Sequence, residues 1–206
     1  MKIAIIAANG RLGRVLVDEA LKAGHSVRAG IRGENNLPTH QNLEVVQCDA
    51  TNISDIKNLI QNQQVVFSAI GHVKGSAADV QTNATKILVS AMNELSLKRF
   101  VDVTGTGVRF PGDKISLVDR FLNLSVGIID PARVKDGRDH VEVLKASNLE
   151  WTTVRILKLQ NVEARPYTLT LNGPTKWYVG REEVAKAMLE VAEKNLFIKQ
   201  APIISK

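Results

Sequence analysis

The chain is poor in the residues that several classes of protein require. It has 206 residues but only one cysteine, Cys48, so it forms no internal disulfide, which fits a reducing compartment. Aromatic residues make up 4%, too few for a platform on which single-stranded nucleic acid stacks. No stretch reaches the roughly 18–20 continuous apolar residues that cross a bilayer. We therefore expect no nucleic-acid partner and no membrane association.

The first apolar run is short as well. Asn9-Gly10-Arg11 interrupts it after about six residues, below the 7–15 of a secretory signal. A buried first strand is the better interpretation, and we expect a cytoplasmic protein.

The charge is one-sided but scattered. The formal net charge is +6 and the pI about 9.5, yet no run of four basic residues occurs. This favours a solvated basic surface, or a pocket for one anionic small molecule, over a nucleic-acid site.

The motifs of three other enzyme classes are missing. There is no glycine–x–serine–x–glycine elbow of a serine hydrolase and no Walker-type glycine–lysine–threonine. The four histidines and one cysteine show no zinc-ligand spacing, so we expect no metal.

What is present is an alternation of short apolar runs and amphipathic stretches. The pattern predicts strands at 2–7, 26–31, 43–48, 64–70, 99–103 and 150–156, and helices at 11–23, 53–61, 77–95, 134–147 and 181–194. Such alternation predicts an α/β fold: a three-layer, Rossmann-type, doubly wound and mostly parallel sheet with a small C-terminal lobe.

The second half of the chain is less regular. Residues 110–133 are predicted as loop around a short helix, 165–179 as a hairpin with Asn172-Gly173 at its tip, and 197–204 as a final strand. We expect one domain over residues 1–206, with the region of about 108–180 on the substrate side.

A glycine-rich segment joins the first strand to the first helix. In Ala7-Ala8-Asn9-Gly10-Arg11-Leu12-Gly13, Gly10 lets the backbone approach a pyrophosphate and Gly13 lets the helix pack closely. The free N–H groups of Arg11 and Leu12 favour an anion at the helix N-terminus. Placed after a buried strand, the pattern predicts dinucleotide binding; the alternative is a tight turn without a ligand.

The end of the second strand bears on the choice of cofactor. Arg32 stands where an acidic residue would favour NAD, and its guanidinium suits a 2′-phosphate, although Glu34 close by opposes this. We expect NADP(H) rather than NAD(H). The alternative for Arg32 is a solvent-facing charge.

Two further strand ends complete the predicted cofactor site. Asp49, followed by Ala50, is placed to accept a hydrogen bond from the adenine amino group, or is a turn residue that leads into a helix. In Ser68-Ala69-Ile70-Gly71, the small residues let the backbone pass along the cofactor.

Together these segments resemble the atypical short-chain dehydrogenase/reductase group, closest to its NAD(P)H-binding, NmrA-like and flavin-reductase-like members. The resemblance runs from residue 1 to about 195 and also rests on segments 98–104, 147–155 and 179–185. Two departures stand out: Ala7 replaces the first glycine of the loop, and Ile156 follows Arg155 where the family has proline.

The catalytic tyrosine–lysine pair of ordinary short-chain dehydrogenases is missing. Four residues after Tyr167 stands Leu171, and four after Tyr178 stands Glu182. This argues against an alcohol dehydrogenase or a sugar-nucleotide epimerase. It leaves hydride transfer to a small-molecule acceptor that needs little proton help, such as a flavin or quinone.

Candidate groups beside the nicotinamide follow the fourth and fifth strands. Thr104 and Thr106 offer hydroxyls, or belong to a loop that merely makes room, and Arg109 lies just beyond. His72 is a proton donor or, as we prefer, a surface histidine. His140 replaces the missing tyrosine as an acid or, as we prefer, is an ordinary helix-face histidine.

The leading hypothesis is an NADPH-dependent reductase of a flavin, quinone or similar acceptor. The alternative is an NADP(H)-binding redox sensor without catalysis, as NmrA-like relatives imply, and a third is an NAD-dependent isomerase or dehydratase. A monomer and a homodimer both remain open, because the helix at 77–95 can be buried in either.

Overall fold

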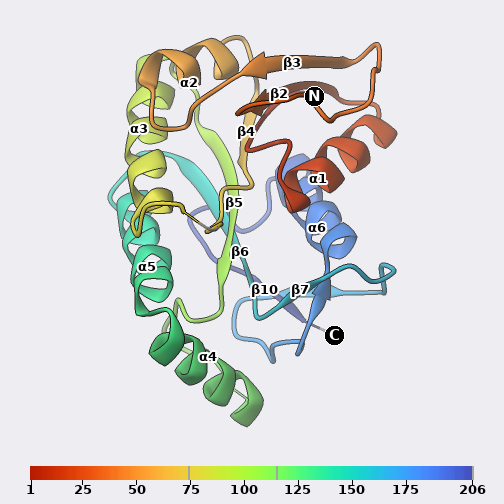
Figure 1. The fold of residues 1–206 in the computed structure, drawn as a ribbon. Helices are drawn as coiled ribbons and strands as arrows, with labels where there is room; N and C mark the ends of the chain where they lie inside the picture. The colour runs from red at the N-terminus through yellow and green to blue at the C-terminus, as the bar shows by residue number, and fades with distance from the viewer. Residues whose placement is uncertain (74, 115, 206) are drawn as a thin grey trace.

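The computed structural model describes residues 1–73, 75–114 and 116–205. Its main sheet has the strand order β3-β2-β1-β4-β5-β6-β10-β8, parallel except for β8 at one edge (Figure 1). The strands are β1 Lys2–Ile6, β2 Ser26–Ile31, β3 Leu43–Gln47, β4 Val65–Ser68, β5 Arg99–Gly105, β6 Glu150–Ile156, β8 Thr168–Thr170 and β10 Ile203–Ser205, and β7 Leu159–Gln160 pairs separately with β9 Val179–Gly180. The helices are α1 Arg11–Lys22, α2 Ile53–Ile60, α3 Val80–Glu94, α4 Leu117–Ile129, α5 Pro131–Lys145 and α6 Arg181–Glu193. The predicted doubly wound α/β fold is confirmed.

The sheet is buried on both faces, as its near-continuous apolar strands predict. Helices α1 and α6 cover one face, and α2, α3 and α5 cover the other (Figure 1). Successive β1 residues alternate between the two cores: Ile3 and Ile5 pack toward α1 and α6, Ala4 and Ile6 toward α2 and α3. The carboxyl ends of the parallel strands therefore meet at one edge, where a ligand of such a sheet binds.

The predicted hairpin at 165–179 is wrong. Strand β8 pairs antiparallel with β10, at the edge of the main sheet, and Val179 pairs with β7 instead. Gly173 has a φ of +87°, but the carbonyl of Asn172 accepts a hydrogen bond from Lys114 N. The backbone groups that a hairpin would pair with each other are thus hydrogen-bonded to Lys114 and to β10, which are distant in the sequence.

Several further element boundaries differ from prediction, by a few residues in β4, α3 and α5, and also in α4, β5 and β10. The short helix predicted within 110–133 is a full helix, α4, opened by the Ser116 hydroxyl, which accepts from Asp119 N. Strand β5 continues to Gly105, which places Thr104 inside the strand. The final strand is shorter than 197–204, because Phe197 and Lys199 adopt φ values of +53° and +56° that an extended strand excludes.

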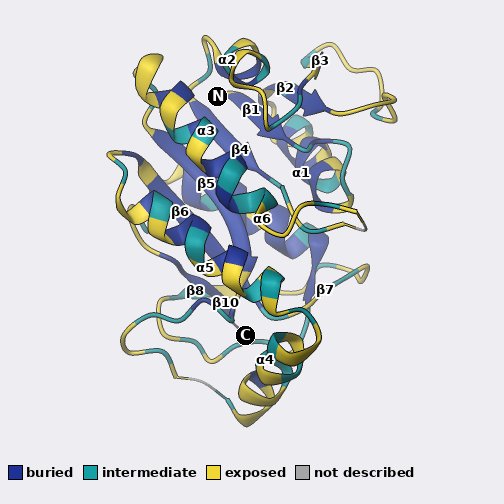
Figure 2. Cartoon of the chain, turned by 60° about the vertical axis from the view of Figure 1, so that its left-hand side comes forward, coloured by how far each residue is buried: buried dark blue, intermediate teal, exposed yellow. Residues whose placement is uncertain are grey.

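Burial is uneven over the molecule. The inner strands β1, β4, β5 and β6 are almost wholly buried and the edge strands β3 and β8 are partly exposed, whereas α4 is exposed along most of its length (Figure 2). No helix among the described residues is long and apolar enough to span a membrane.

Candidate functional site

The turn between β1 and α1 depends on its glycines. Gly10 N donates to Ala7 O at 3.0 Å, which closes the turn. A Cβ on Gly13 would lie 2.2 Å from Ala7 O and 2.8 Å from Ala8 Cα, both backbone atoms. Only glycine therefore lets the first turn of α1 rest against the end of β1. Ala7, which replaces the family's first glycine, has a φ of +57°, a left-handed conformation that glycine adopts more readily.

The first backbone N–H groups of α1 lack the side-chain acceptors and acidic residues found at the N-termini of the other helices. Arg14 N donates to Gly10 O, which leaves the N–H groups of Arg11, Leu12 and Gly13 outside the helical bonding pattern. Its N-cap, Gly10, has no side chain to offer, and its first turn contains no acidic residue. The other five helices differ: side chains accept from the first turns of α2, α3, α4 and α5 (Asn52, Asp136, Ser116 and Asp130), and α6 has two glutamates there. An anion fits the α1 N-terminus best.

Two arginines add positive charge beside this helix end. Arg181, the first residue of α6, is buried, and its Nη1 donates to Asn161 Oδ1. Burial lowers the pKa of Arg181 and the charge of Arg11 lowers it further, so the two guanidinium groups lie near each other. Among the described residues, neither forms an ion pair with a carboxylate. Their repulsion would be relieved by a bound anion.

The predicted residues at the ends of β2 and β3 lie close to this turn. Asn9 Nδ2 donates to Arg32 O at 3.0 Å and thereby fixes the end of β2. Thr51 donates twice to Asp49 Oδ1, at 2.9 Å from its N and 2.7 Å from its hydroxyl. These bonds, and then the charge of Arg32, lower the pKa of Asp49, so Arg32 lies near Asp49. Ala50 follows, half-buried.

The end of β4 provides the opposite wall of the predicted cofactor site. Ala69 N donates to Ile6 O, and Ile70 O accepts from Gln81 Nε2. Gly71 is exposed, and a Cβ placed on it would meet nothing within 4 Å. The structure thus brings the predicted cofactor residues to one edge of the sheet, around the ends of β1, β2, β3 and β4.

Of the candidates at the end of β5, Thr104 is buried, and Thr106 and Arg109 have structural partners. Thr104 is buried in β5, and a Cβ on Gly137 would lie 3.2 Å from its hydroxyl. The Thr106 hydroxyl accepts from Asn123 Nδ2 at 3.0 Å, and Arg109 pairs with the buried Asp119. Thr106 and Arg109 therefore hold α4 in place.

His72 is not the surface histidine that we expected. Its Nε2 lies 2.8 Å from Oδ2 of the buried Asp136, and its side chain is largely buried. Asp136 also accepts from the Thr82 hydroxyl and from the backbone N–H groups of Gln81 and Thr82, and these bonds hold its pKa below the ordinary value against the effect of burial. The pair ties α5 and the loop after β4 to the first turn of α3.

His140 is buried more deeply than an ordinary helix-face histidine, with 1% of its surface exposed. Its Nε2 lies 3.1 Å from Asp102 Oδ2, out of line for a hydrogen bond, and Nδ1 lies 3.3 Å from Asp136 O. Burial disfavours charge on His140, but the Asp102 carboxylate outweighs it and raises the pKa above the usual 6.5. A cavity of about 10 Å³ adjoins the pair, lined also by Ser68, Gln81 and Thr85, with room for about one water.

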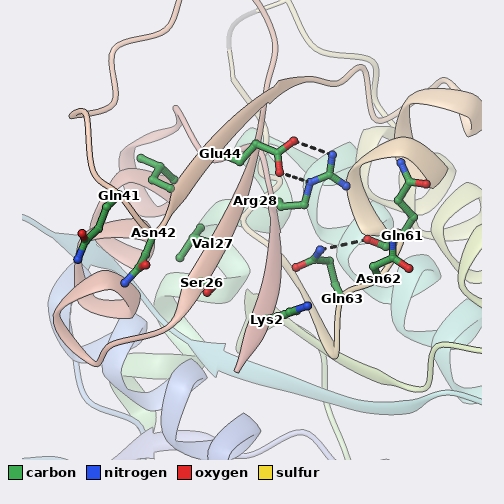
Figure 3. A pocket seen from close by; sticks show the side chains of 11 residues that line it. Lys2, Ser26, Val27, Arg28, Gln41, Asn42, Glu44, Gln61, Asn62 and Gln63 are labelled. Carbon is green, nitrogen blue, oxygen red and sulfur yellow. Dashed lines mark hydrogen bonds and ion pairs between the residues drawn. The ribbon is translucent and has the colours of Figure 1, made fainter.

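An open hollow of about 560 Å³ lies at the other edge of the sheet (Figure 3). It is open and surrounded by the amino ends of β1, β2 and β3 and by residues 61–63. Its arginine is already satisfied, because Arg28 makes two bonds of 2.9 Å to Glu44 and another to Asn58 O. This hollow is therefore on the wrong edge for a dinucleotide.

Comparison with known proteins agrees with the geometry of the carboxyl edge. The model of the NAD(P)H-binding family matches residues 7–195. The chain belongs to this family. Among curated relatives of this NAD(P)H-binding protein, Protein TIC 62, chloroplastic, from Pisum sativum is 27% identical over 176 residues, or 73% of this chain. The matched part is 31% of that relative, so the chain spans about a third of the length of the TIC 62 proteins.

Solved structures share the fold over nearly the whole chain. A short-chain dehydrogenase/reductase from Veillonella parvula DSM 2008, in complex with NADP, has a TM-score of 0.81 at 21% identity, covering 99% of this chain and 94% of that one. SP1627 from Streptococcus pneumoniae TIGR4, a suspected NADH-flavin reductase, has a TM-score of 0.79 at 22% identity, covering 99% and 98%. At these identities, the likeness establishes the Rossmann-like fold.

Two residues of the site were not singled out from the sequence. Arg181 and Asp102 lie within segments that carry the family resemblance, but neither was given a role. A charged residue within the apolar strand 99–103 was a visible signal for Asp102. Nothing in the sequence placed Arg181 beside Arg11, because the two are 170 positions apart and meet only through the packing of α6 against α1.

Proposed function

We propose that this NAD(P)H-binding protein is an NADPH-dependent reductase that passes hydride to a flavin, a quinone or a similar conjugated acceptor. The α1 N-terminus carries the proposal, because its free N–H groups and the nearby Arg11 and Arg181 suit a pyrophosphate. When bound, the dinucleotide supplies the hydride. The chain binds and orients both reactants and keeps them face to face.

The preference for NADPH over NADH rests on Arg32. Its side chain is exposed at the end of β2 and lies near Asp49, at the strand end where the ribose of a dinucleotide binds in such folds. A guanidinium there suits the 2′-phosphate, with two parallel N–H donors. The Veillonella relative, which binds NADP, is consistent with this preference.

A conjugated acceptor fits the scarcity of acid–base groups. The tyrosine–lysine pair is missing, Thr106 and Arg109 are bonded to α4, and His140 faces Asp102 inside the protein. Positioning then provides most of the rate enhancement, which suits hydride transfer to a flavin or quinone. The suspected NADH-flavin reductase activity of SP1627 supports the same class of acceptor.

The cofactor assignment is tested by binding. We expect Arg32→Gln to raise the Kd for NADPH roughly 10–100-fold, the worth of a charge-assisted hydrogen bond, and to leave the Kd for NADH unchanged. Arg138→Gln is the matched control, because it removes the same charge from an exposed position on α5. Equal losses for both dinucleotides would refute the role of Arg32.

The reaction is tested by turnover of FMN, riboflavin and menadione with NADPH. Activity that falls in parallel with cofactor affinity in Arg181→Gln would support the proposal. Tight cofactor binding without turnover of any acceptor across a broad panel would contradict it.

A redox sensor is the second candidate function. The observation in its favour is that His72, Thr106, Arg109 and His140 all have structural partners, so the site offers little proton-transfer chemistry. A sensor requires a partner protein whose affinity differs between the NADP and NADPH forms. Equal affinity for both forms would exclude the switch.

A further inference from the structure

Helix α4 is oriented against the usual rule for an amphipathic helix. Leu117, Phe121, Leu124 and Ile128 are 82%, 69%, 64% and 74% exposed, on a helix that is exposed along most of its length (Figure 2). The opposite side contains Asp119, which is completely buried. A surface helix normally buries its apolar stripe, so this outer face is built to be covered.

Polar contacts explain why the apolar side faces outward. Asp119 pairs with Arg109 and accepts from the Thr175 hydroxyl at 2.7 Å and from Asn123 Nδ2 at 3.0 Å. Asn123 Nδ2 also donates to Thr106 Oγ1. These bonds fix the rotation of α4 about its own axis, so the helix cannot turn its apolar face inward without leaving a buried carboxylate unpartnered.

The spacing of the outer residues suits a second helix. Positions 117, 121, 124 and 128 follow one another at intervals of four, three and four, the a/d spacing of a helix that packs along another helix. Val118 and Ile129 flank this stripe on one side and are also exposed. Together with the four stripe residues they form an apolar patch on the order of several hundred Å², the scale of the roughly 800 Å² that each partner contributes to an interface of standard size.

The charges on and beside α4 distinguish between a protein and a lipid membrane as the partner of its apolar face. Helices that bind anionic membranes carry many lysines and arginines around their apolar face. Arg120 is the one exposed charge on α4. The start of α5 has mixed signs, with Asp130 next to Arg133 and Lys135. The face therefore lacks the basic cluster that a membrane would need.

We propose that α4 is the interface of a homodimer, in which the stripe formed by Leu117, Phe121, Leu124 and Ile128 packs against the same stripe of a second copy. A two-fold axis brings identical patches together, and a uniformly apolar stripe is complementary to itself.

The test is sedimentation of the purified full-length chain between about 1 and 100 µM. We expect a dimer in this range and a dissociation constant at least 100-fold higher in Phe121→Glu. Leu95→Glu is the matched control, because Leu95 is an exposed leucine at the end of α3, and it should leave the dimer unchanged. Thermal melting of the dilute protein, with and without NADPH, checks that each variant folds and binds cofactor.

Three results would overturn the proposal. The first is a wild-type chain that stays monomeric throughout the concentration range. The second is a dimer that Phe121→Glu leaves intact, because the interface would then lie elsewhere. The third is a monomer that co-sediments with vesicles of phosphatidylcholine and phosphatidylglycerol through the same face, which would identify lipid as the occupant.

Discussion

The close contact between α1 and β1 predicts a large effect of one methyl group. In Gly13→Ala, the new Cβ would lie 2.2 Å from Ala7 O and within 3 Å of two backbone atoms of Ala8. No flexible side chain is available to move aside, so the helix must shift as a body. Overpacking of this kind costs about 2–4 kcal/mol, which exceeds the gain of about 1 kcal/mol from replacing glycine by alanine in a helix.

The assay for this effect is thermal and urea unfolding. For a chain of this length, each kcal/mol corresponds to about 2–4 °C in Tm, so the net loss of about 1–3 kcal/mol should lower Tm by roughly 2–12 °C. NADPH binding should weaken as well, because the shift moves the N–H groups of Arg11 and Leu12. Gly127→Ala is the control, since a Cβ there meets nothing within 4 Å and should stabilise α4 slightly. A Gly13→Ala variant with wild-type Tm and wild-type NADPH affinity would refute the reasoning.

Three further predictions concern stability. Ala7→Gly should stabilise the protein by up to about 1 kcal/mol in urea unfolding, because it relieves a left-handed alanine; a loss of more than this would contradict the reading of its φ. Asp136→Asn should destabilise by about 3 kcal/mol, because it weakens bonds to His72 and to the N-terminus of α3, and an unchanged urea midpoint would argue against it. Asp102 raises the pKa of His140 against the effect of burial, so the interaction of protonated His140 with Asp102 should stabilise the fold fully below about pH 6.5 and be lost as pH rises through the folded-state pKa. Asp102→Asn should therefore flatten the pH profile of the unfolding free energy, and an unchanged profile would contradict the pairing.

The sequence was most informative where local pattern and tertiary structure agree. Strands such as β1 are apolar on both faces, so their buried position in a parallel sheet could be predicted from Ile3 to Ile6 alone. The glycine turn was equally clear, because Gly10 and Gly13 follow the strand and open the helix. Its close backbone approach is what the glycine spacing implied.

Prediction failed where distant contacts decide the structure. Asn172-Gly173 is a strong hairpin signal, but Lys114 and β10 take the backbone groups on either side of it. The pairing of His140 with Asp102 was hidden for a related reason, since two ionisable residues 38 positions apart carry no sign of contact in the chain. The orientation of α4 about its own axis could not be predicted either. Its apolar periodicity suggests that the apolar stripe is buried, but the bonds of Asp119 to Arg109 and Thr175 turn the polar side inward instead.

The contacts that hold α4 connect the proposed interface with the proposed acceptor site. Thr106 and Arg109 follow β5, at the edge where we propose that the nicotinamide binds, and both bond to the inner side of α4 through Asn123 and Asp119. A second copy that orders α4 would therefore also order this wall, and mass action would make the effect depend on protein concentration. We expect KM for a flavin or quinone to fall as enzyme concentration rises through the dimer dissociation constant, while the Kd for NADPH, set at α1, stays constant. In Phe121→Glu, KM should be high at every concentration. A KM that does not change across the dimerisation range would show that the interface and the acceptor site are independent.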